Sequence, residues 1–320
     1  MKEFPLTVFT EPLSATGFIP RVKSFAKLMR GLIQGKFERK KYGGHYAVTR
    51  SLIEGLQKIN APFNYNPNRE KDIFENVLVL AGVERLKHAI QLKKAGKLLT
   101  LAAGPNVVED VRSENQLAAD PAIDRYIVPS RWVEDLVIND CEKLKDRVRV
   151  WYAGIDTEYW KPVIEVNLRQ QVLIYWKTEP EEFYQKVVAV LEQRQIPHTT
   201  IRYGNYTQPE YKTLLGKSRL AIFISRSESQ GIALAEAWSM DVPSYVFDPG
   251  EFFFTGRMIH NVSASPYLVR EAGKTWNSIH ELEQLLDDKN SLAAFSPRKY
   301  ALEKFTDAYC ARQLLDVLRK

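Results

Sequence analysis

The sequence predicts an α/β protein built from two doubly wound, Rossmann-like domains that face a central cleft. Short runs of apolar and β-branched residues alternate with longer amphipathic segments, which is the pattern of a parallel sheet whose strands are joined by helices. The alternation stops at residues 154–163 and then starts again. A length of 320 residues suits two such domains, because an ordinary domain has about 150 residues.

The first half begins with a strand at 5–9 and a helix at 43–59, whose apolar residues recur at helical spacing. Ser130 is placed to cap the start of a later helix, and Gly96 is placed to end an earlier one. The further elements expected here are strands at 76–82, 97–104, 124–129 and 147–154, and helices at 84–96 and 130–140.

Residues 154–163 suit a linker, because they combine Gly154, an Asp-Thr turn and Pro162. The chain ends in a long helical pattern over 297–320. The second half is expected to contain strands at 171–176, 198–204, 219–225 and 243–248, and helices at 180–194, 208–217 and about 230–240. We therefore predict one domain over 1–157, a second over 158–298 and a final helix over 299–320.

The segment 225–243, SRSESQGIALAEAWSMDVP, is the most informative about chemistry. A buried strand ends at its first residue and Gly231 opens a helix, and ligands of such sheets bind at the carboxyl ends of strands beside helix amides. Glu228 lies in the loop and Glu236 is expected two turns into the helix. Two carboxylates so placed can accept hydrogen bonds from a ribose and from a sugar ring, with the linking phosphates at the helix start between them.

Glu228, Glu236 and the surrounding ESQGIALAEAWSMDVP resemble the Glu-x7-Glu motif of the retaining GT-B glycosyltransferases, group 1, family-4-like. Asp241 departs from the family pattern, since many relatives have glycine there. The resemblance implies that Glu228 contacts the donor sugar and that Glu236 binds the ribose. It also implies that backbone close to the sugar and diphosphate comes from Ser229, Gln230, Gly231 and Ile232. The alternative is a glutamate favoured by the helix dipole and a second one facing solvent.

Lys177 follows the strand at 171–176, where the family usually has an arginine, and a cation there would neutralise the diphosphate leaving group. The family's second basic residue has no counterpart in 178–185. A solvated surface lysine is the other interpretation of Lys177. Tyr203 and Gly204 end the next strand, where relatives place residues near the nucleobase; a simple tight turn fits them equally well.

Gly43 and Gly44 precede the helix at 45–59 and resemble the Gly-Gly loop of the family's N-terminal domain, which lies against the donor phosphates or the acceptor. The resemblance implies an acceptor-side domain over 1–157 and nucleotide-sugar binding over 158–298. It further implies that the final helix, 299–320, packs back on the N-terminal domain.

The predicted function is transfer of a sugar from a nucleoside-diphosphate sugar to a glycan, a lipid-linked sugar or another acceptor, and the resemblance implies retention of configuration. We expect neither a metal nor another cofactor, because the chain has no Asp-x-Asp loop and Lys177 with helix dipoles would take the metal's place. The alternatives are a nucleotide-sugar epimerase of the same architecture, a nucleic-acid-modifying glycosyltransferase and a binding module with a degenerate GT-B fold.

Composition indicates a cytoplasmic protein: there is no run of 18 uncharged apolar residues, no signal peptide, and only two cysteines. The net charge of +6 is uneven, with eight basic residues against one acid, Glu38, between Arg21 and Lys41. Residues 21–41 therefore favour a phosphate-bearing contact, such as an anionic membrane, a lipid-phosphate acceptor or a nucleic acid. A solvated helix face explains the same charges equally well.

Overall fold

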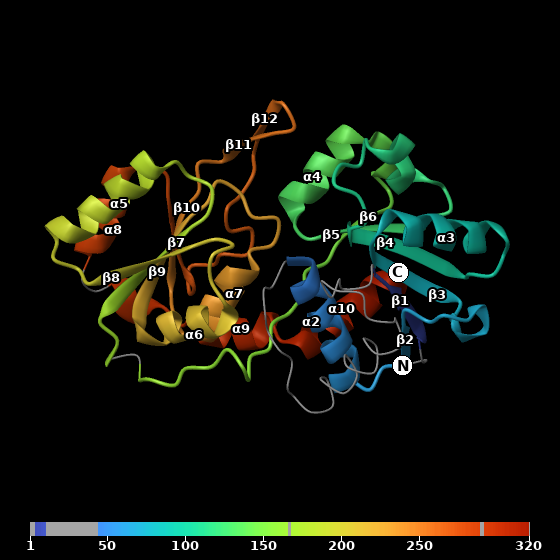
Figure 1. Cartoon of the computed structure of the whole chain (residues 1–320), viewed down its shortest axis with the longest axis horizontal. Coiled ribbons are helices and arrows are strands. Elements are labelled where there is room, and N and C mark those ends of the chain that lie inside the picture. Colours follow the sequence, from blue (N-terminus) through green and yellow to red (C-terminus); the bar gives the residue numbers. More distant parts are fainter. Residues whose placement is uncertain (1–3, 11–43, 166–167, 289–290, 320) are drawn as a thin grey trace. The chain divides into compact units, whose positions relative to one another are not determined.

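The structure is a computed structural model and describes residues 4–10, 44–165, 168–288 and 291–319 (Figure 1). By its internal contacts the chain divides into two units, and each unit contains its own parallel sheet. Unit 1 comprises residues up to 129, 134–153 and 310–320, and unit 2 comprises 130–133 and 154–309. The last part of the chain thus groups with unit 1, whereas the domain boundaries drawn from the sequence stay predictions.

Unit 1 has a six-stranded sheet in the order β2-β1-β3-β4-β5-β6, and all its pairs are parallel. Every residue of β1 and β3 is buried, as expected of parallel strands covered on both faces. The strands are β1 (Leu6–Phe9), β2 (Phe63–Tyr65), β3 (Asn76–Ala81), β4 (Thr100–Asn106), β5 (Arg125–Val128) and β6 (Val148–Val150).

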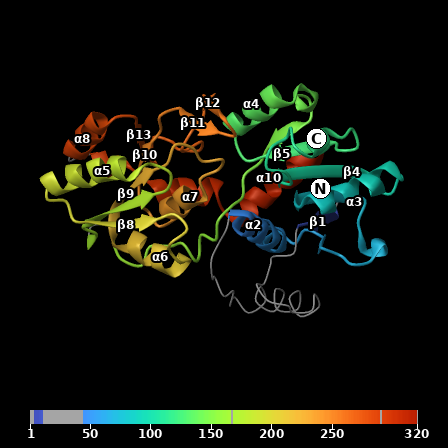
Figure 2. The same ribbon diagram turned by 45° about the horizontal axis from the view of Figure 1, so that its top comes forward.

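Side chains at the sheet of unit 1 donate hydrogen bonds to backbone carbonyls in the last part of the chain. Trp151 Nε1 donates to Cys310 O at 2.8 Å, and Arg125 Nε donates to Val317 O at 3.1 Å. In both ribbon views α10 lies beside α2 (Figures 1 and 2). The helices here are α2 (Gly44–Lys58), α3 (Val83–Lys94), α4 (Arg131–Asp140) and α10 (Asp307–Arg319).

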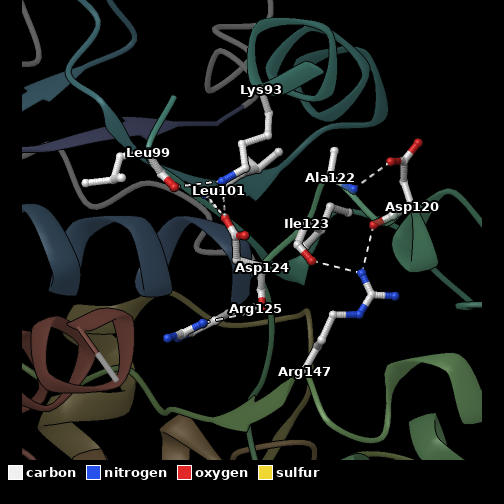
Figure 3. Close-up of polar contacts among 9 residues, drawn as sticks. All are labelled: Lys93, Leu99, Leu101, Asp120, Ala122, Ile123, Asp124, Arg125 and Arg147. Atoms are coloured by element: carbon white, nitrogen blue, oxygen red, sulfur yellow. Dashed lines mark hydrogen bonds and ion pairs between the residues drawn. The ribbon is translucent and has the colours of Figure 1, made fainter. Parts of the chain in front are cut away.

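Polar contacts fix the loops that enter β4, β5 and β6 (Figure 3). Asp124 Oδ2 accepts from Lys93 Nζ at 2.8 Å and from Leu101 N at 2.7 Å, so one carboxylate joins a helix end to two strands. Arg147 Nη1 donates to Ile123 O at 2.8 Å, just before β5. These bonds satisfy backbone groups that the ends of the strands leave unpaired.

Unit 2 has a five-stranded parallel sheet in the order β13-β10-β9-β7-β8. The chain enters at β7, adds β8 on one side and then returns to add β9 on the other. The strand order therefore reverses between β7 and β9. The strands are β7 (Gln171–Trp176), β8 (His198–Arg202), β9 (Ser218–Ile224), β10 (Ser244–Phe247) and β13 (Gly273–Trp276).

Alternate residues of β7 face opposite layers of unit 2. Ile174 and Trp176 belong to the core that Phe183 of α5 and Leu285 of α8 cover, whereas the Tyr175 ring lies 5.7 Å from the Tyr211 ring of α6. The helices are α5 (Glu181–Gln193), α6 (Gln208–Lys217), α7 (Ile232–Ser239), α8 (Ile279–Asp287) and α9 (Pro297–Lys304). Over the described ranges of the chain, none of the helices is both long and apolar enough to cross a membrane.

Five short elements of the structure were not predicted. They are β2, β13, α8 and the two strands of an antiparallel hairpin, β11 (Glu251–Phe254) and β12 (Arg257–His260). The strands among them have three or four residues, which is too short for a period to show in the sequence. The helix α8 has a Ser278 cap that accepts from Glu281 N, a local signal that the sequence analysis overlooked.

Two predicted features differ in the structure. Ser130 Oγ is buried without a hydrogen-bond partner, so this side chain does not cap α4. The helical pattern over 297–320 forms two helices, because α9 ends at Lys304 and α10 begins at Asp307. Between them Thr306 pairs with Ile155 in an isolated parallel bridge. The segment expected to be a linker is therefore tied to the break between these two helices.

Gly154→Ala should lower the free energy of unfolding by about 2 kcal/mol, because the added Cβ overlaps backbone. It would lie 2.8 Å from Asp307 Cα and N, which a paired segment cannot easily move. Urea unfolding monitored by tryptophan fluorescence measures the loss.

Gly216→Ala is the matched control, since its Cβ would meet only Met240 Cε at 3.8 Å and alanine favours the helix. Equal unfolding midpoints for both variants would contradict a close packing of residues 154 and 307.

Candidate functional site

The edge of the unit 2 sheet at the carboxyl ends of its strands is where the candidate site lies. In open parallel sheets a crevice forms where the strand order reverses, because the helices that follow the two central strands cover opposite faces. The reversal in this sheet lies between β7 and β9. The loop after β7 begins at Lys177, and the loop after β9 carries Glu228. Two of the predicted site residues therefore stand at the reversal point.

Lys177 and Glu228 meet across this point. Lys177 Nζ donates to Glu228 Oε1 at 2.8 Å, and about a fifth of each side chain is exposed. The backbone holds both residues: Lys177 N donates to Ile224 O at 3.0 Å, and Glu228 N donates to Ser263 O at 2.9 Å. Backbone hydrogen bonds thus fix both residues of the pair, while part of each side chain stays exposed.

Tyr203 joins Lys177 from the third strand. Its ring lies 4.7 Å from Lys177 Nζ, within the range of a cation–π contact, and half of the side chain is exposed. Tyr203 N donates to Trp176 O at 2.8 Å, which places the residue directly beyond β8. Gly204 follows with φ of +83°, so the turn and the exposed ring are both present.

The start of α7 has the geometry of an anion site. Gly231 caps the helix with φ of +82° and ψ of +54°, a left-handed conformation that favours glycine. A Cβ there would lie 2.9 Å from Leu234 Cδ1. The preceding Ser229 is exposed and Gln230 is buried, and Ile232 is the first residue of the helix. Amides at such a helix start attract phosphate groups.

Glu236 lies closer to the helix start than predicted. It is the fifth residue of α7, one turn in rather than two, and only 7% of it is exposed. Gln208 Nε2 donates to Glu236 Oε1 at 3.5 Å, and Gln208 Oε1 is buried without a hydrogen-bond partner. Gln208 was not among the predicted site residues; the local signal at this position is Thr207, which caps α6 just before it.

Three tyrosines, of which Tyr175 and Tyr211 are buried and Tyr206 is half-buried, form a layer beside the two glutamates. Tyr175 and Tyr206 share a hydrogen bond of 3.0 Å between their hydroxyls, and Tyr211 donates to Ala233 O at 2.8 Å. Burial raises the pKa of all three phenols, and the negative charge of Glu228 raises each pKa further. The layer therefore stays uncharged at neutral pH.

A second ion pair joins the same two loops, and the sequence analysis missed it. Arg226 Nε lies 2.7 Å from Glu179 Oε1, and Arg226 Nη2 donates to Glu179 Oε2 at 3.1 Å. In the sequence, the position of Arg226 two residues before Glu228 could have indicated that it lies near the site. Its partner was not visible, because 47 residues separate the two side chains.

Of the residues predicted in the first half of the chain, only some lie among the described residues. Gly43 and the basic segment 21–41 lie outside the described residues. Gly44 is the exposed first residue of α2, and nothing lies within 4 Å of where its Cβ would be. Within the part of the chain that the structure describes, no group of three or more His, Cys, Asp or Glu side chains is arranged to hold a metal ion.

Neither a family model nor a curated protein sequence matches this chain. Solved structures do match. The lipopolysaccharide outer core galactosyltransferase WaaB in its apo form superimposes with a TM-score of 0.59 at 10% identity, over 99% of both chains. Sucrose-phosphate synthase from Thermosynechococcus elongatus gives 0.52 at 9% identity, over 99% of this chain and 98% of that one. The fold is GT-B.

A third match with the GT-B fold is TarM from S. aureus, crystallised with fondaparinux, α-GlcNAc-glycerol and UDP. Its TM-score is 0.51 at 12% identity, over 77% of this chain and 56% of that one. At such identities the likeness concerns the fold alone. The GT-B fold agrees with the two parallel sheets, each with its own reversal of strand order.

The tyrosine layer predicts a loss of stability at high pH. A phenol with a raised pKa in the folded state keeps its proton after the unfolded chain has lost it, at pH above about 10. The stabilisation is complete below that pH and is lost as the pH rises, by about 1.4 kcal/mol per pH unit for each such tyrosine.

The test compares urea midpoints at pH 8 and pH 10.5 for the wild type and Tyr206→Phe. The variant should lose less stability between the two pH values, because one of the three groups is gone. The same loss in both proteins would show that Tyr206 does not resist ionisation.

Proposed function

We propose that this chain is a GT-B glycosyltransferase that moves a sugar from a nucleoside-diphosphate sugar to an acceptor. The observation that carries the proposal is the Lys177–Glu228 pair at the point where the strand order reverses. A cation and a carboxylate at one spot suit a ligand with an anionic leaving group beside a polyhydroxylated ring. The start of α7 at Gly231 adds backbone amides that can bind phosphate. Glu236 lies five residues further along the same helix.

Proteins of similar fold support this choice. WaaB is named a galactosyltransferase, TarM was crystallised with UDP, and the catalytic domain of starch synthase IV from Arabidopsis thaliana was crystallised with ADP and acarbose. The last has a TM-score of 0.50 at 10% identity, over 87% of this chain and 78% of that one. Nucleotides and glycans are therefore the ligand classes to test first.

In the proposed complex the site residues of unit 2 contact the diphosphate, the sugar, the ribose and the nucleobase of the donor. Lys177 contacts the diphosphate and neutralises the charge that develops on it as the sugar leaves. Glu228 keeps one oxygen on Lys177 and accepts hydrogen bonds from the donor sugar with the other. Glu236 binds the ribose hydroxyls, and Tyr203 and Gly204 lie next to the nucleobase. Backbone amides of residues 229–232 contact the diphosphate.

We further propose that transfer retains the configuration of the donor carbon and needs neither a metal nor another cofactor. The bond from that carbon to the diphosphate oxygen breaks, and a bond to the acceptor oxygen forms on the same face. The departing phosphate takes the proton of the acceptor hydroxyl, so that no side-chain base is required. The proposed acceptor is a glycan or a lipid-linked sugar.

A thermal-shift screen against UDP, ADP, GDP and their sugars tests the proposal, because a ligand of the folded state raises the melting temperature. We expect one nucleotide series to stabilise the protein. Incubation of the stabilising donor without acceptor should leave its sugar unchanged. No shift with any of these compounds would rule the proposal out.

Glu228→Gln should reduce kcat/KM for transfer by about a hundredfold or more, because the neutral amide no longer stabilises the transition state. The melting temperature should change by only a few degrees, since the side chain is at the surface of the site. A coupled assay of nucleoside-diphosphate release measures the rate. Glu192→Gln, an exposed glutamate on α5, is the control and should keep full activity; a Glu228 variant as active as this control contradicts the assigned role.

Glu236→Ala should weaken binding of the nucleoside diphosphate about tenfold, because a charged acceptor for the ribose hydroxyls is lost. Isothermal titration measures the affinity. The corresponding 2′,3′-dideoxynucleoside diphosphate lacks these hydroxyls and should bind both proteins alike. If the variant loses the same factor for both nucleotides, Glu236 acts elsewhere than at the ribose.

A further inference from the structure

Arg226 and Glu179 form an unusual pair beside Lys177 and Glu228. The carboxylate is almost completely buried, with 1% of the side chain exposed, whereas 40% of the arginine side chain is exposed. A buried carboxylate is costly unless it is paired, so Glu179 depends on Arg226 for its charge. The reverse does not hold, because the exposed guanidinium is also solvated.

The backbone of each residue of the pair is held by a hydrogen bond to a nearby side chain. Arg226 N donates to Thr178 Oγ1 at 3.1 Å, and Trp176 Nε1 donates to Glu179 O at 2.6 Å. The contacts with Glu179 involve Nε and Nη2, which form one edge of the guanidinium. An arginine has five N–H donors in a rigid fork, so the remaining donors can bind another acceptor without breaking this edge.

Charge balance indicates what that acceptor is. At the reversal point two cations, Lys177 and Arg226, stand against two carboxylates, Glu228 and Glu179. The arrangement is neutral before a ligand binds. A diphosphate brings more than one negative charge, and Lys177 alone, shared with Glu228, cannot balance it. Arg226 is the neighbouring cation on the loop that leads to Gly231, five residues later.

We propose that Arg226 is a second cation of the diphosphate site and that the buried Glu179 fixes its guanidinium in place for that ligand. This inference rests on the proposed function and names a residue that contacts the donor. Arg226 keeps its edge on Glu179 and donates from the rest of the fork to a phosphate oxygen.

The test measures affinities of the purified full chain for UDP, UMP and uridine, with ADP, AMP and adenosine as a second series. Arg226→Gln should weaken the diphosphate about tenfold and leave the nucleoside within about twofold, because only phosphate contacts are lost. Glu179→Gln should weaken the diphosphate several-fold and leave the nucleoside within about twofold, because the neutral amide holds the guanidinium of Arg226 less firmly. The double variant, Glu179→Gln with Arg226→Gln, leaves no unpaired buried charge and should bind the diphosphate as weakly as Arg226→Gln.

Arg194→Gln is the matched control, because Arg194 forms a similar two-point pair with Asp287 at the far end of α5 and should leave every affinity unchanged. Melting temperatures are recorded for all variants. If Arg226→Gln does not fold, the affinities of the double variant replace those of the single variant in the test. A purely structural pair predicts that Glu179→Gln and Arg226→Gln weaken the diphosphate and the nucleoside alike, and that result overturns the proposal. If the wild type binds neither series, the proposed function fails first; if it binds and the variants match it, only Arg226 is wrong.

Discussion

The reversal of strand order between β7 and β9 is the constraint on which the site depends. The helix after β7 covers one face of the sheet, and Tyr211 of α6 together with Ala233 of α7 lies on the other. The two loops must therefore part at their common edge, which leaves room for a ligand between backbone segments that the sheet holds rigidly. The loops can carry polar side chains there because β7 and β9 are almost wholly buried.

Electrostatic pairing across that edge keeps the site ordered without a ligand. Each loop contributes one cation and one carboxylate, and each cation pairs with the carboxylate of the opposite loop. Such an arrangement avoids an uncompensated charge near the buried strands, which would cost several kcal/mol. It also holds both cations in defined positions at the edge of the sheet.

Aromatic side chains pack at the end of β7 on both faces of the sheet, next to these ion pairs. Trp176 is stacked on Tyr184, with ring centroids 4.4 Å apart, and the Arg202 guanidinium lies 4.4 Å from the same indole. On the opposite face the hydroxyls of Tyr175 and Tyr206 satisfy each other, which lets a polar layer remain buried. The end of β7, and with it Lys177, is thereby fixed on both faces of the sheet.

Features that depend on neighbours along the chain could be predicted from the amino-acid sequence. The buried runs of β3, β7 and β9 were predicted because unbroken apolar segments of five residues are distinctive, and the spacing of Glu228 and Glu236 is a local property. Which loops meet could be seen only in the folded protein. The pairing of Arg226 with Glu179, and of Gln208 with Glu236, follows from strand order and helix packing, and these bring together side chains 47 and 28 residues apart. Such contacts leave no periodic trace in a single sequence, because the sheet rather than the local chain sets their distance.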